Sequence, residues 1–429
     1  MAARVKWSKR LCVNWVSIMD KLLSVGRRII PRFIFNFFQP AYHYTLALLA
    51  ALIYRFPSRK IKIVMITGTK GKSTTAELVN SILEAANLRT ALTSTIRTKI
   101  GEKVYLNLHK MTTPGRFFLQ KFLRDSVQAK CDWAIIEMTS QAVSQYRHKF
   151  IPFEALIFTG IHPEHIEAHG SFDNYLNAKL ELARTKPNII VSNLDDPHGQ
   201  KFLDYAREQK IGFKLSDPFP YQTDLPGEFN KRNVLAAVAF ARSISIPESA
   251  IETGIKNQKH VPGRMEFIDN KLGITVVVDY AHTTGSLQGV YEAMSQSSKV
   301  KSQNAKLICV LGACGGGRDK WKRPEFGKIA EKYCDKIILT DEDPYDEDPQ
   351  AIVADIETGI VDKSKYEIEM DRRQAIKKAI SDAKMGDVVM ITGKGTDPYI
   401  MRSHGQKEAW SDSRVAREEL VKVFPPNPS

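Results

Sequence analysis

The sequence predicts an α/β protein, with two parallel-sheet domains in succession behind a basic, apolar helical arm. Three observations predict this fold class. Apolar strand runs alternate with helical patterns from residue 61 onward, glycine-rich turns follow several of these runs, and positive charge is concentrated at the N-terminus. Such alternation is typical of sheets covered by helices on both faces. We divide the chain into three domains at residues 1–58, 59–261 and 262–429.

The first of these, the arm, holds most of the charge. Residues 1–60 carry 11 Lys or Arg and one acid, Asp20, which amounts to +10 of the chain's net +14. The rest of the chain is close to balanced, so its body is not expected to bind nucleic acid. Five scattered cysteines without a C-x-x-C pair argue against a disulfide framework or a zinc ribbon, and they suit a reducing compartment such as the cytoplasm.

Two segments of the arm differ in character. Residues 5–30 show a helical stripe through Leu11, Trp15 and Ile18 with Arg and Lys on the other faces. Residues 33–54 hold no formal charge and are long enough for a bilayer, but polar residues interrupt them. We expect either contact with the inner membrane surface through residues 1–58 or packing against the next domain. No small-residue cleavage site follows, so we expect no removable signal peptide.

The most informative segment opens the second domain. An apolar strand at Ile61–Ile66 precedes Gly68-Thr69-Lys70-Gly71-Lys72-Ser73-Thr74, and a helical pattern follows. Glycines let backbone N–H groups approach phosphate oxygens, Lys72 would neutralise the outer phosphates, and the Ser73 hydroxyl would reach Mg²⁺. The spacing is two residues shorter than in the usual phosphate loop, because Ile66 stands where the first glycine would be. A plain glycine turn is the alternative. The Lys-Ser-Thr run favours nucleotide binding.

Polar residues follow the next strands of this domain, Trp133–Ile136 and Ala155–Phe158. Glu137 could hold Mg²⁺ or belong to an N-cap cluster. The later loop, Thr159–Gly170, carries three histidines without zinc-site spacing, so His165 beside a second Mg²⁺ is the preferred interpretation. Another strand is predicted at Ile189–Ser192.

The third domain repeats this pattern. Strands are predicted at Thr275–Val278, Lys306–Leu311, Lys336–Leu339 and Val388–Ile391, and a motif follows each: Asp279–His282, Gly312–Lys320, Thr340–Tyr345 and Gly393–Asp397. Each motif alone could be a turn or a solvated loop. Ligands of such sheets lie beyond the strand carboxyl ends, where these motifs meet. There the acidic run at 340–345 would attract an amine.

Together these residues resemble the Mur ligase family, and most of all its MurE-type members, over about residues 59–420. That family joins a carboxylate to an amine with ATP. The segments that carry the resemblance are the phosphate loop Gly68–Thr74, Gly227–Asn233, Pro262–Glu266, Asp279–His282, Gly315–Pro324 and Ala178-Lys179. Thr112-Thr113-Pro114 and the Thr139, Gln145 and Arg147 positions match segments with which MurE-type enzymes hold a muramoyl-dipeptide.

The resemblance implies roles for named residues, with ATP and Mg²⁺ as cofactors. Lys72, Glu137, His165 and Lys179, the last carbamylated, would be catalytic, and Ser73, Glu137 and His165 would hold metal. ATP would be bound by Gly68, Thr69, Lys70, Gly71, Lys72, Ser73, Thr74, Asn233, Arg264, Asp279 and His282. Substrates would be bound by Thr112, Thr113, Thr139, Gln145, Arg147, Arg318, Lys320, Glu342, Asp343, Gly393 and Asp397.

Departures from the family pattern leave substrate questions open. The family's UDP-binding domain is not matched. We therefore consider two acceptors, a UDP-linked muropeptide and a lipid-linked muropeptide. Met111, Gln141, Gly160 and Glu164 replace family residues, and the diaminopimelate motif D-N-P-R becomes Glu342–Tyr345. Loss of that Arg makes a lysine-like amine as credible as diaminopimelate.

Three alternatives to a MurE-type ligase are kept. They are a folylpolyglutamate synthase-like ligase, a MurT-type amidating ligase and a non-catalytic nucleotide-binding scaffold at the membrane. The missing zinc ribbon weighs against the second, and the Thr112–Thr113 match weighs against the first. We expect a monomeric cytoplasmic enzyme, associated with the inner face of the membrane if the arm binds there.

Overall fold

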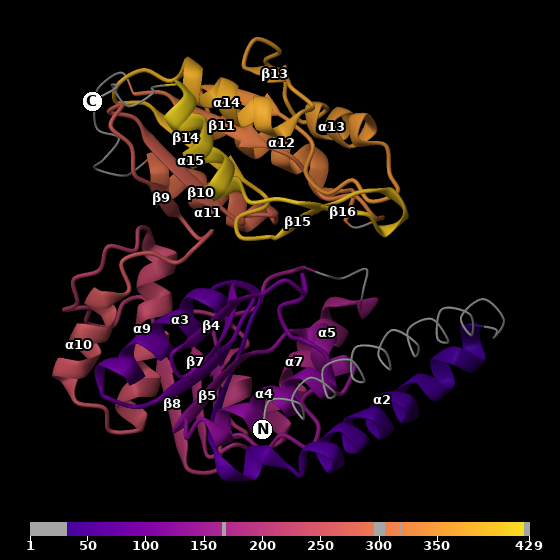
Figure 1. The fold of residues 1–429 in the computed structure, drawn as a ribbon, viewed down its shortest axis with the longest axis vertical. Helices are drawn as coiled ribbons and strands as arrows, with labels where there is room; N and C mark the ends of the chain where they lie inside the picture. The colour runs from indigo at the N-terminus through magenta and orange to yellow at the C-terminus, as the bar shows by residue number, and fades with distance from the viewer. Residues whose placement is uncertain (1–31, 165–168, 296–304, 318, 424–429) are drawn as a thin grey trace, which may run out of the picture.

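The computed structural model describes residues 32–164, 169–295, 305–317 and 319–423. Two α/β units, each built on its own sheet, stack one above the other, and helix α2 runs obliquely along the central unit, with its Tyr54 end on the side away from the C-terminal unit (Figure 1). We call the unit from β1 to α10 the central unit and the unit from β9 to α15 the C-terminal unit. The α/β fold class is confirmed, whereas the domain boundaries at 58 and 261 stay predictions.

The central sheet has eight strands in the order β4-β3-β2-β5-β1-β6-β7-β8, parallel from β2 to β8. Its strands are β1 Lys62–Thr67, β2 Thr90–Thr93, β3 Arg97–Ile100, β4 Lys103–Leu106, β5 Trp133–Glu137, β6 Ala155–Phe158, β7 Ile189–Asn193 and β8 Gln209–Phe213. Its helices are α3 Lys72–Ala85, α4 Arg116–Gln128, α5 Ser140–Ser144, α7 Phe172–Arg184, α8 Gly199–Leu203, α9 Glu228–Ser243 and α10 Glu248–Asn257, preceded by the short η1 Pro57–Lys60.

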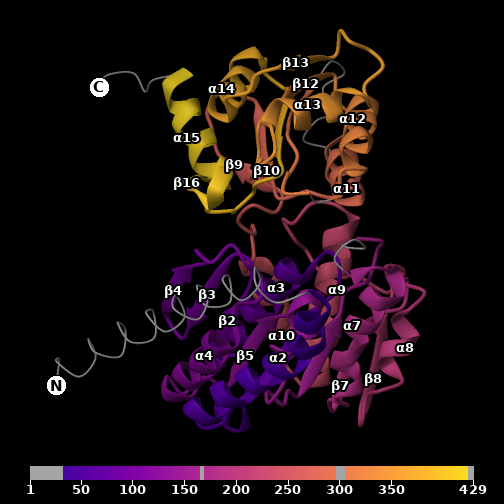
Figure 2. The same cartoon turned by 90° about the vertical axis from the view of Figure 1, so that its right-hand side faces the viewer.

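Strand alternation gives this sheet two hydrophobic layers. Val64 and Ile66 of β1 pack with α3 and α9 on one face, while Ile63 and Met65 pack with α4 and α7 on the other. A parallel strand that is buried on both faces has to be apolar throughout, which explains why the run at 61–66 is almost entirely apolar. The carboxyl ends of β1, β5 and β6 point toward the C-terminal unit (Figure 2).

The C-terminal sheet has the order β13-β12-β11-β14-β10-β9, with only β9 antiparallel. Its strands are β9 Glu266–Ile268, β10 Thr275–Asp279, β11 Leu307–Leu311, β12 Lys336–Leu339, β13 Tyr366–Ile368 and β14 Val388–Thr392, and the hairpin β15 Tyr399–Met401 and β16 Lys407–Ala409 stands apart. The helices are α11 Thr284–Ser295, α12 Lys322–Tyr333, α13 Pro349–Glu357, α14 Arg372–Asp382 and α15 Asp412–Val423, with a short η3 at Ser403–Gly405. The eight strands predicted from the sequence are all present.

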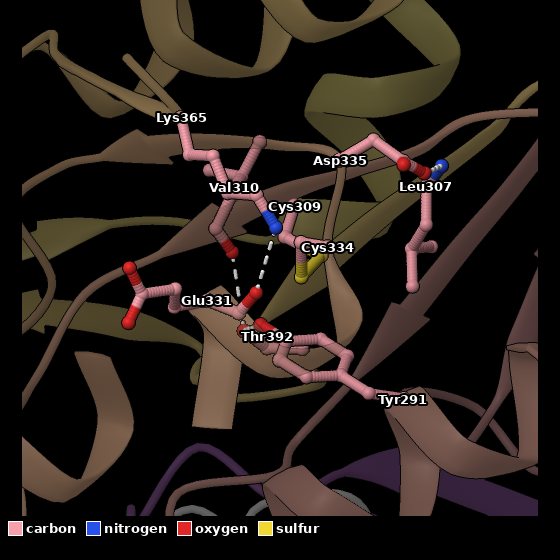
Figure 3. The surroundings of a disulfide bond; sticks show 9 residues. All are labelled: Tyr291, Leu307, Cys309, Val310, Glu331, Cys334, Asp335, Lys365 and Thr392. Atoms are coloured by element: carbon pink, nitrogen blue, oxygen red, sulfur yellow. Dashed lines mark hydrogen bonds between the residues drawn. A yellow bond between two sulfur atoms is a disulfide. The ribbon is translucent and has the colours of Figure 1, made fainter. Parts of the chain in front are cut away.

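One disulfide corrects the interpretation of the cysteines. Cys309 in β11 bonds to Cys334, the residue that ends α12, with Cα atoms 6.2 Å apart (Figure 3). Helix α12 packs back onto the strand that precedes it, which brings together two residues 25 positions apart in the chain. Scattered spacing hid this pair, so the argument against disulfides fails here. Of the described residues, Cys131 and Cys314 form no disulfide.

The charge-free part of the arm forms one helix, α2, Arg32–Tyr54, with Pro40 inside it. Ala47, Ala50 and Ala51 are buried, and the Tyr44 ring contacts Tyr146 and Phe150 edge-on. The helix therefore packs against the central unit, as one of the two expectations held. No helix in the described residues is long and apolar enough to cross a membrane. The basic stripe predicted at 5–30 lies outside the described residues.

Candidate active site

The loop between β1 and α3 has a shape that only glycine allows. Gly71 has a φ of 81°, and a Cβ there would come within 2.2 Å of the Asn233 side-chain oxygen. A Cβ on Gly68 would come within 2.0 Å of the Thr159 hydroxyl. Helix α3 begins at Lys72, directly after the loop, so its unpaired backbone N–H groups face the loop. The loop has the shape expected of an anion cradle, and Asn233 of α9 lies against it. Binding of ATP phosphates by these residues stays a prediction.

Ser73 and Glu137 form a buried pair beside this loop. The Ser73 hydroxyl donates to the Glu137 carboxylate at 3.1 Å, and the backbone N–H of Thr95 donates to the same carboxylate at 2.8 Å. The alternative N-cap role for Glu137 is not seen, because Thr139 caps α5 through its own hydroxyl. A hydroxyl beside a carboxylate is a donor set that fits Mg²⁺, which keeps most of its water ligands in such sites.

Two lysines, Lys72 and Lys179, donate hydrogen bonds to backbone carbonyls of the phosphate loop. The Lys179 amine on α7 donates to the Gly68 carbonyl at 2.8 Å, and the Lys72 amine donates to the Thr69 carbonyl at 2.8 Å. Burial, together with the nearby Lys72 cation, lowers the pKa of Lys179 well below its usual value. Burial also lowers the pKa of Lys72. A lysine in this situation holds an unprotonated amine far more readily than one in water.

The histidine-rich loop reaches the same place only in part. His165 lies outside the described residues, so its role as a metal ligand stays a prediction. Its neighbour Glu164 is buried, and its charge acts on Lys70, Lys72 and Lys179. Sequence reasoning named Glu164 only as a departure from the family pattern. Within the described ranges no group of three or more His, Cys, Asp or Glu side chains is arranged to hold a metal.

The five residues predicted to hold the acceptor are brought together next to Glu137. Thr113 donates to the Glu137 carbonyl at 2.9 Å and accepts from the Thr139 N–H at 3.0 Å. Thr112 accepts from the Thr95 hydroxyl at 2.9 Å. The Arg147 guanidinium donates to the Gln145 side chain at 3.1 Å and to the Thr113 carbonyl. Burial and the neighbouring Arg116 cation lower the pKa of Arg147 to about 10, so it stays charged at neutral pH.

The C-terminal unit faces this cluster with carboxylates. Lys110, from the central unit, forms ion pairs with Asp343 at 2.6 Å and Asp397 at 3.5 Å. Lys394 joins the same two carboxylates at 2.8 and 3.1 Å. This two-lysine, two-aspartate cluster spans both units. Sequence reasoning named Asp343 and Asp397 and placed Lys394 in the Gly393–Asp397 motif, but it missed Lys110, because a cross-unit ion pair leaves no local pattern.

Glu342 lies beside that cluster and is fully enclosed. A Cβ on Gly393 would come within 2.2 Å of its carboxylate, so glycine is required for Glu342 to fit. Burial raises the pKa of Glu342 to about 7, although the Arg372 cation opposes the shift. The carboxyl is therefore poised near neutrality, between its charged and uncharged forms.

Three of the residues predicted to bind ATP, Asp279, Arg264 and His282, lie close together near the start of the C-terminal unit. Asp279 accepts two backbone hydrogen bonds, from Met265 and Ala281, both at 2.7 Å, so in the structure it fixes the backbone at these two positions. The Arg264 guanidinium lies 4.3 Å from the Tyr280 ring centre. His282 contacts the Tyr280 carbonyl at 3.0 Å.

The phosphate loop itself also reaches the C-terminal unit. A Cβ on Gly285 of α11 would come within 2.4 Å of the Lys70 amine, so this lysine crosses between the units. Lys320 instead pairs with Glu347 of its own unit at 3.2 Å and is exposed. Arg318 lies outside the described residues. Substrate binding by these two basic residues stays a prediction.

Comparisons with known proteins agree with this geometry. The Mur ligase middle domain matches residues 66–217, and the Mur ligase glutamate ligase domain matches residues 263–395. The UDP-N-acetylmuramoyl-L-alanyl-D-glutamate–2,6-diaminopimelate ligase of Syntrophomonas wolfei is 36% identical over 406 residues, covering 87% of this chain and 81% of that protein. The ligase of the same name from Aquifex aeolicus is 36% identical over 389 residues, covering 85% and 78%.

Solved structures add the fold. A structure of a ligase with that same name has 26% sequence identity and a TM-score of 0.59, covering 85% of this chain and 79% of its own. The folylpolyglutamate synthase of Mycobacterium tuberculosis, solved with ADP and AMPPCP, has a TM-score of 0.64 at 14% identity, covering 90% and 96%. At that identity the second likeness shows the fold alone.

The fold and the site therefore define an ATP-dependent ligase that forms an amide bond between a carboxylate and an amine. The chain belongs to the Mur ligase family, and its relatives named above are MurE-type enzymes of peptidoglycan synthesis. A non-catalytic scaffold is not supported by these matches. The folylpolyglutamate synthase-like alternative is supported only by the similarity of the fold.

Proposed function

We propose that this ligase adds an amino acid with a cationic side chain, such as lysine or diaminopimelate, to a muramoyl-dipeptide linked to UDP or to a lipid. One observation carries the proposal. Thr113 bonds both the Glu137 carbonyl and the Thr139 N–H, so the acceptor residues and the Ser73–Glu137 pair form one hydrogen-bonded unit. A carboxylate held near Arg147 and Thr113 would lie beside the terminal phosphate of ATP in the loop.

The chain's own groups would act in a fixed order. Arg147 and the threonines orient the acceptor carboxylate, whose oxygen bonds to the terminal phosphorus as the bond to ADP breaks. Lys72 and the loop N–H groups stabilise the charge on the transferring phosphoryl group. The amine nitrogen then bonds to the acyl carbon of the acyl phosphate, phosphate leaves, and the amine loses a proton. Ser73 and Glu137, with His165, would hold Mg²⁺, which supplies charge neutralisation at the phosphates when bound.

Lys179 has the chemistry expected of a carbamylated lysine. Carbon dioxide adds to an unprotonated amine, and burial beside Lys72 lowers the pKa of Lys179 in that direction. The carbamate would place a negative charge next to the Lys72 cation. Mass spectrometry of the native protein with and without bicarbonate, compared with a Lys179→Met variant, tests this role.

The carboxylates of the C-terminal unit support a cationic amine. Asp343 and Asp397 already bind the ammonium of Lys110, and the Tyr345 ring lies 5.6 Å from that ammonium. A substrate ammonium is the group that this environment would accept in place of Lys110. Where the family motif has an arginine for a distal carboxylate, this chain has Tyr345.

We also infer that the enzyme works as a monomer in the cytoplasm, with residues 1–58 in contact with the inner face of the membrane. The helix α2, which carries no formal charge after Arg32, supports that contact. Membrane fractionation of the intact chain and of a chain beginning at Ser58 tests it, and light scattering tests the monomer. Equal absence of both chains from membranes would contradict the contact.

The ligase proposal is tested by ATP-dependent phosphate release with UDP-MurNAc-L-Ala-D-Glu and a panel of lysine, ornithine, diaminopimelate and glutamate. Turnover with one or more of the diamines and none with glutamate is expected. Turnover with glutamate alone would contradict a cationic amine. Measurable ATP binding with no turnover on this acceptor would contradict the UDP-linked form and lead to the same panel with a lipid-linked acceptor.

A further inference from the structure

An open cavity of about 1040 Å³ lies at the edge of the central sheet opposite the phosphate loop. Its walls come from the segments that enter the parallel strands: residues 58–63 before and in β1, 131–133 at β5, 148–154 before β6 and 185–188 before β7. The phosphate loop, Glu137 and Thr159 instead follow the carboxyl ends of β1, β5 and β6. Because the two edges are separated by the length of the strands, this cavity is no part of the ligase site. We call it the base cavity.

The base cavity is strongly cationic. Its lining includes six Lys or Arg and two acids; the cations are Arg59, Lys60, Lys62, Lys149, Lys186 and Arg207. In the described part of the chain none of these six has an ion-pair partner, and three lie over aromatic rings instead. The two acids are engaged elsewhere: Asp132 accepts from the Arg89 N–H, and Glu154 accepts from Asn188. Unpaired cations gathered around a cavity attract an anion.

A buried side chain in the cavity wall also lacks a partner. His148 is 3% exposed, and neither ring nitrogen has a hydrogen bond among the described residues. Burial, with the neighbouring Lys149 cation, lowers its pKa to about 3, so the ring is neutral at pH 7 and carries one N–H donor. A buried donor without an acceptor is costly. Both nitrogens are themselves enclosed, so the ring forms part of the cavity wall and does not contact an anion in the cavity.

An uncharged apolar surface adjoins the cavity. Phe38, Leu49, Leu52 and Ile53 of α2 are between 45% and 60% exposed, and their spacing puts them on one face of the helix. The opposite face packs on Tyr146 and Phe150 through Tyr44, and Phe150 also lines the base cavity. Figure 1 shows α2 running obliquely, with its Tyr54 end at the part of the central unit that is remote from the C-terminal unit. Leu49, Leu52 and Ile53 belong to that end, whereas Gln39 and His43 near the other end share a cavity with Gln145.

We propose that the base cavity and the exposed face of α2 form one docking surface for an anionic lipid bilayer. The apolar face enters the interface, and the cavity holds the phosphate of a lipid headgroup among its six cations. This inference deepens the membrane contact proposed above and extends it from the arm to the central unit. It is independent of the amine and acceptor of the ligase.

The proposed docking has a consequence for the reaction. A bilayer at the base leaves the phosphate loop, at the opposite edge of the same sheet, facing the cytoplasm. Soluble ATP and a soluble, nucleotide-linked acceptor reach such a site directly, whereas an acceptor anchored in the same bilayer does not. The docked orientation therefore favours the UDP-linked muropeptide.

The test is flotation of the full chain with phosphatidylcholine vesicles, with and without phosphatidylglycerol. A base variant carries Lys60→Glu, Lys186→Glu and Arg207→Glu. A matched control carries Lys271→Glu, Lys377→Glu and Lys384→Glu, three exposed lysines of the C-terminal unit with the same change in net charge. We expect the base variant to lose roughly a hundredfold in binding to anionic vesicles, since each cation near an anionic leaflet contributes about fivefold. The control should lose no more than about threefold from net charge alone.

Further arms separate the alternatives. Leu49→Ser, Leu52→Ser and Ile53→Ser together should also weaken vesicle binding, and unchanged binding would overturn the proposal that this face enters the bilayer. Binding of inorganic phosphate, but not of vesicles, would assign the cavity to a free anion and overturn the docking proposal. Equal binding by the base variant and its control would overturn it too. ATP-dependent phosphate release by the base variant, measured without vesicles, reports separately on the ligase proposal.

Discussion

The two edges of the central sheet hold their lysines in opposite ways. At the phosphate-loop edge, Lys72 and Lys179 donate to backbone carbonyls, and burial lowers the pKa of each. At the base, Lys60, Lys62 and Lys186 are exposed and without ion-pair partners in the described structure. A lysine held in place by hydrogen bonds, as at the phosphate-loop edge, can act on one atom of a substrate. Exposed lysines without partners, as at the base, attract a charged surface instead. We therefore assign the reaction to one edge of the sheet and membrane attachment to the other.

The largest expected effect comes from the phosphate-loop edge. Lys72→Met should lower kcat by roughly a thousandfold, because it removes the cation that stabilises the transferring phosphoryl group. Phosphate-release kinetics measure this. Lys201→Met, on the surface of α8, is the control and should stay within about twofold. A Lys72 variant with normal kcat would break the distinction between the two edges.

The disulfide predicts a large effect on stability rather than on activity. Closing the segment from Cys309 to Cys334 restricts the unfolded chain, which is worth about 3 kcal/mol for a loop of this length. Urea unfolding with and without dithiothreitol should show that difference. A Cys309→Ser, Cys334→Ser variant should not respond to the reductant. Equal unfolding of the wild-type chain in both conditions would show that the bond does not form.

Glu342 gives a pH-dependent prediction with a defined sign. Its pKa is about 7 in the folded protein against 4.5 for the ordinary group, so the folded state holds a proton that the unfolded state has released. Stability should therefore fall as pH rises from about 4.5 to about 7, and the loss is complete above pH 7. Glu342→Gln should raise the free energy of unfolding at pH 8 by up to about 3 kcal/mol and flatten this profile.

The control for that prediction is Glu208→Gln, an exposed carboxyl remote from the cluster. Urea unfolding at several pH values between 4.5 and 8 compares the two variants. An unchanged pH profile in Glu342→Gln would mean that the carboxyl is not enclosed as described.

The smallest predicted effect concerns Lys110. Lys110→Met frees Asp343 and Asp397 from a competing ammonium, so KM for a diamine should fall severalfold, about 1 kcal/mol in binding. The KM for ATP should stay constant, and Lys103→Met on exposed β4 is the control. A rise in the diamine KM would instead mean that Lys110 helps to bind the substrate or to hold the two units together.

Sequence reasoning anticipated contacts that follow from strand order. Ser73 and Glu137 meet because β1 and β5 are adjacent parallel strands whose carboxyl ends share an edge. The grouping of Thr113 with Arg147 was expected instead from the resemblance to MurE-type enzymes. Strand order alone would not have placed these two residues together.

Contacts that depend on how distant segments pack were not predictable. Lys110 finds Asp343 only because the two units stack, and Cys334 reaches Cys309 only because α12 folds back onto β11. The base cavity joins residues from four strand entries, none of which forms a motif. The periodicity and spacing of residues in the sequence carry no information on contacts between such distant segments.

The central claim is that the phosphate-loop edge couples ATP hydrolysis to amide formation with a cationic amino acid. Mass spectrometry of UDP-MurNAc-L-Ala-D-Glu after reaction, with phosphate release measured in the same sample, tests it most directly. The account predicts a product heavier by one diamine less one water for every phosphate released. Phosphate released with no change in the acceptor's mass, or with glutamate added in place of a diamine, would contradict it.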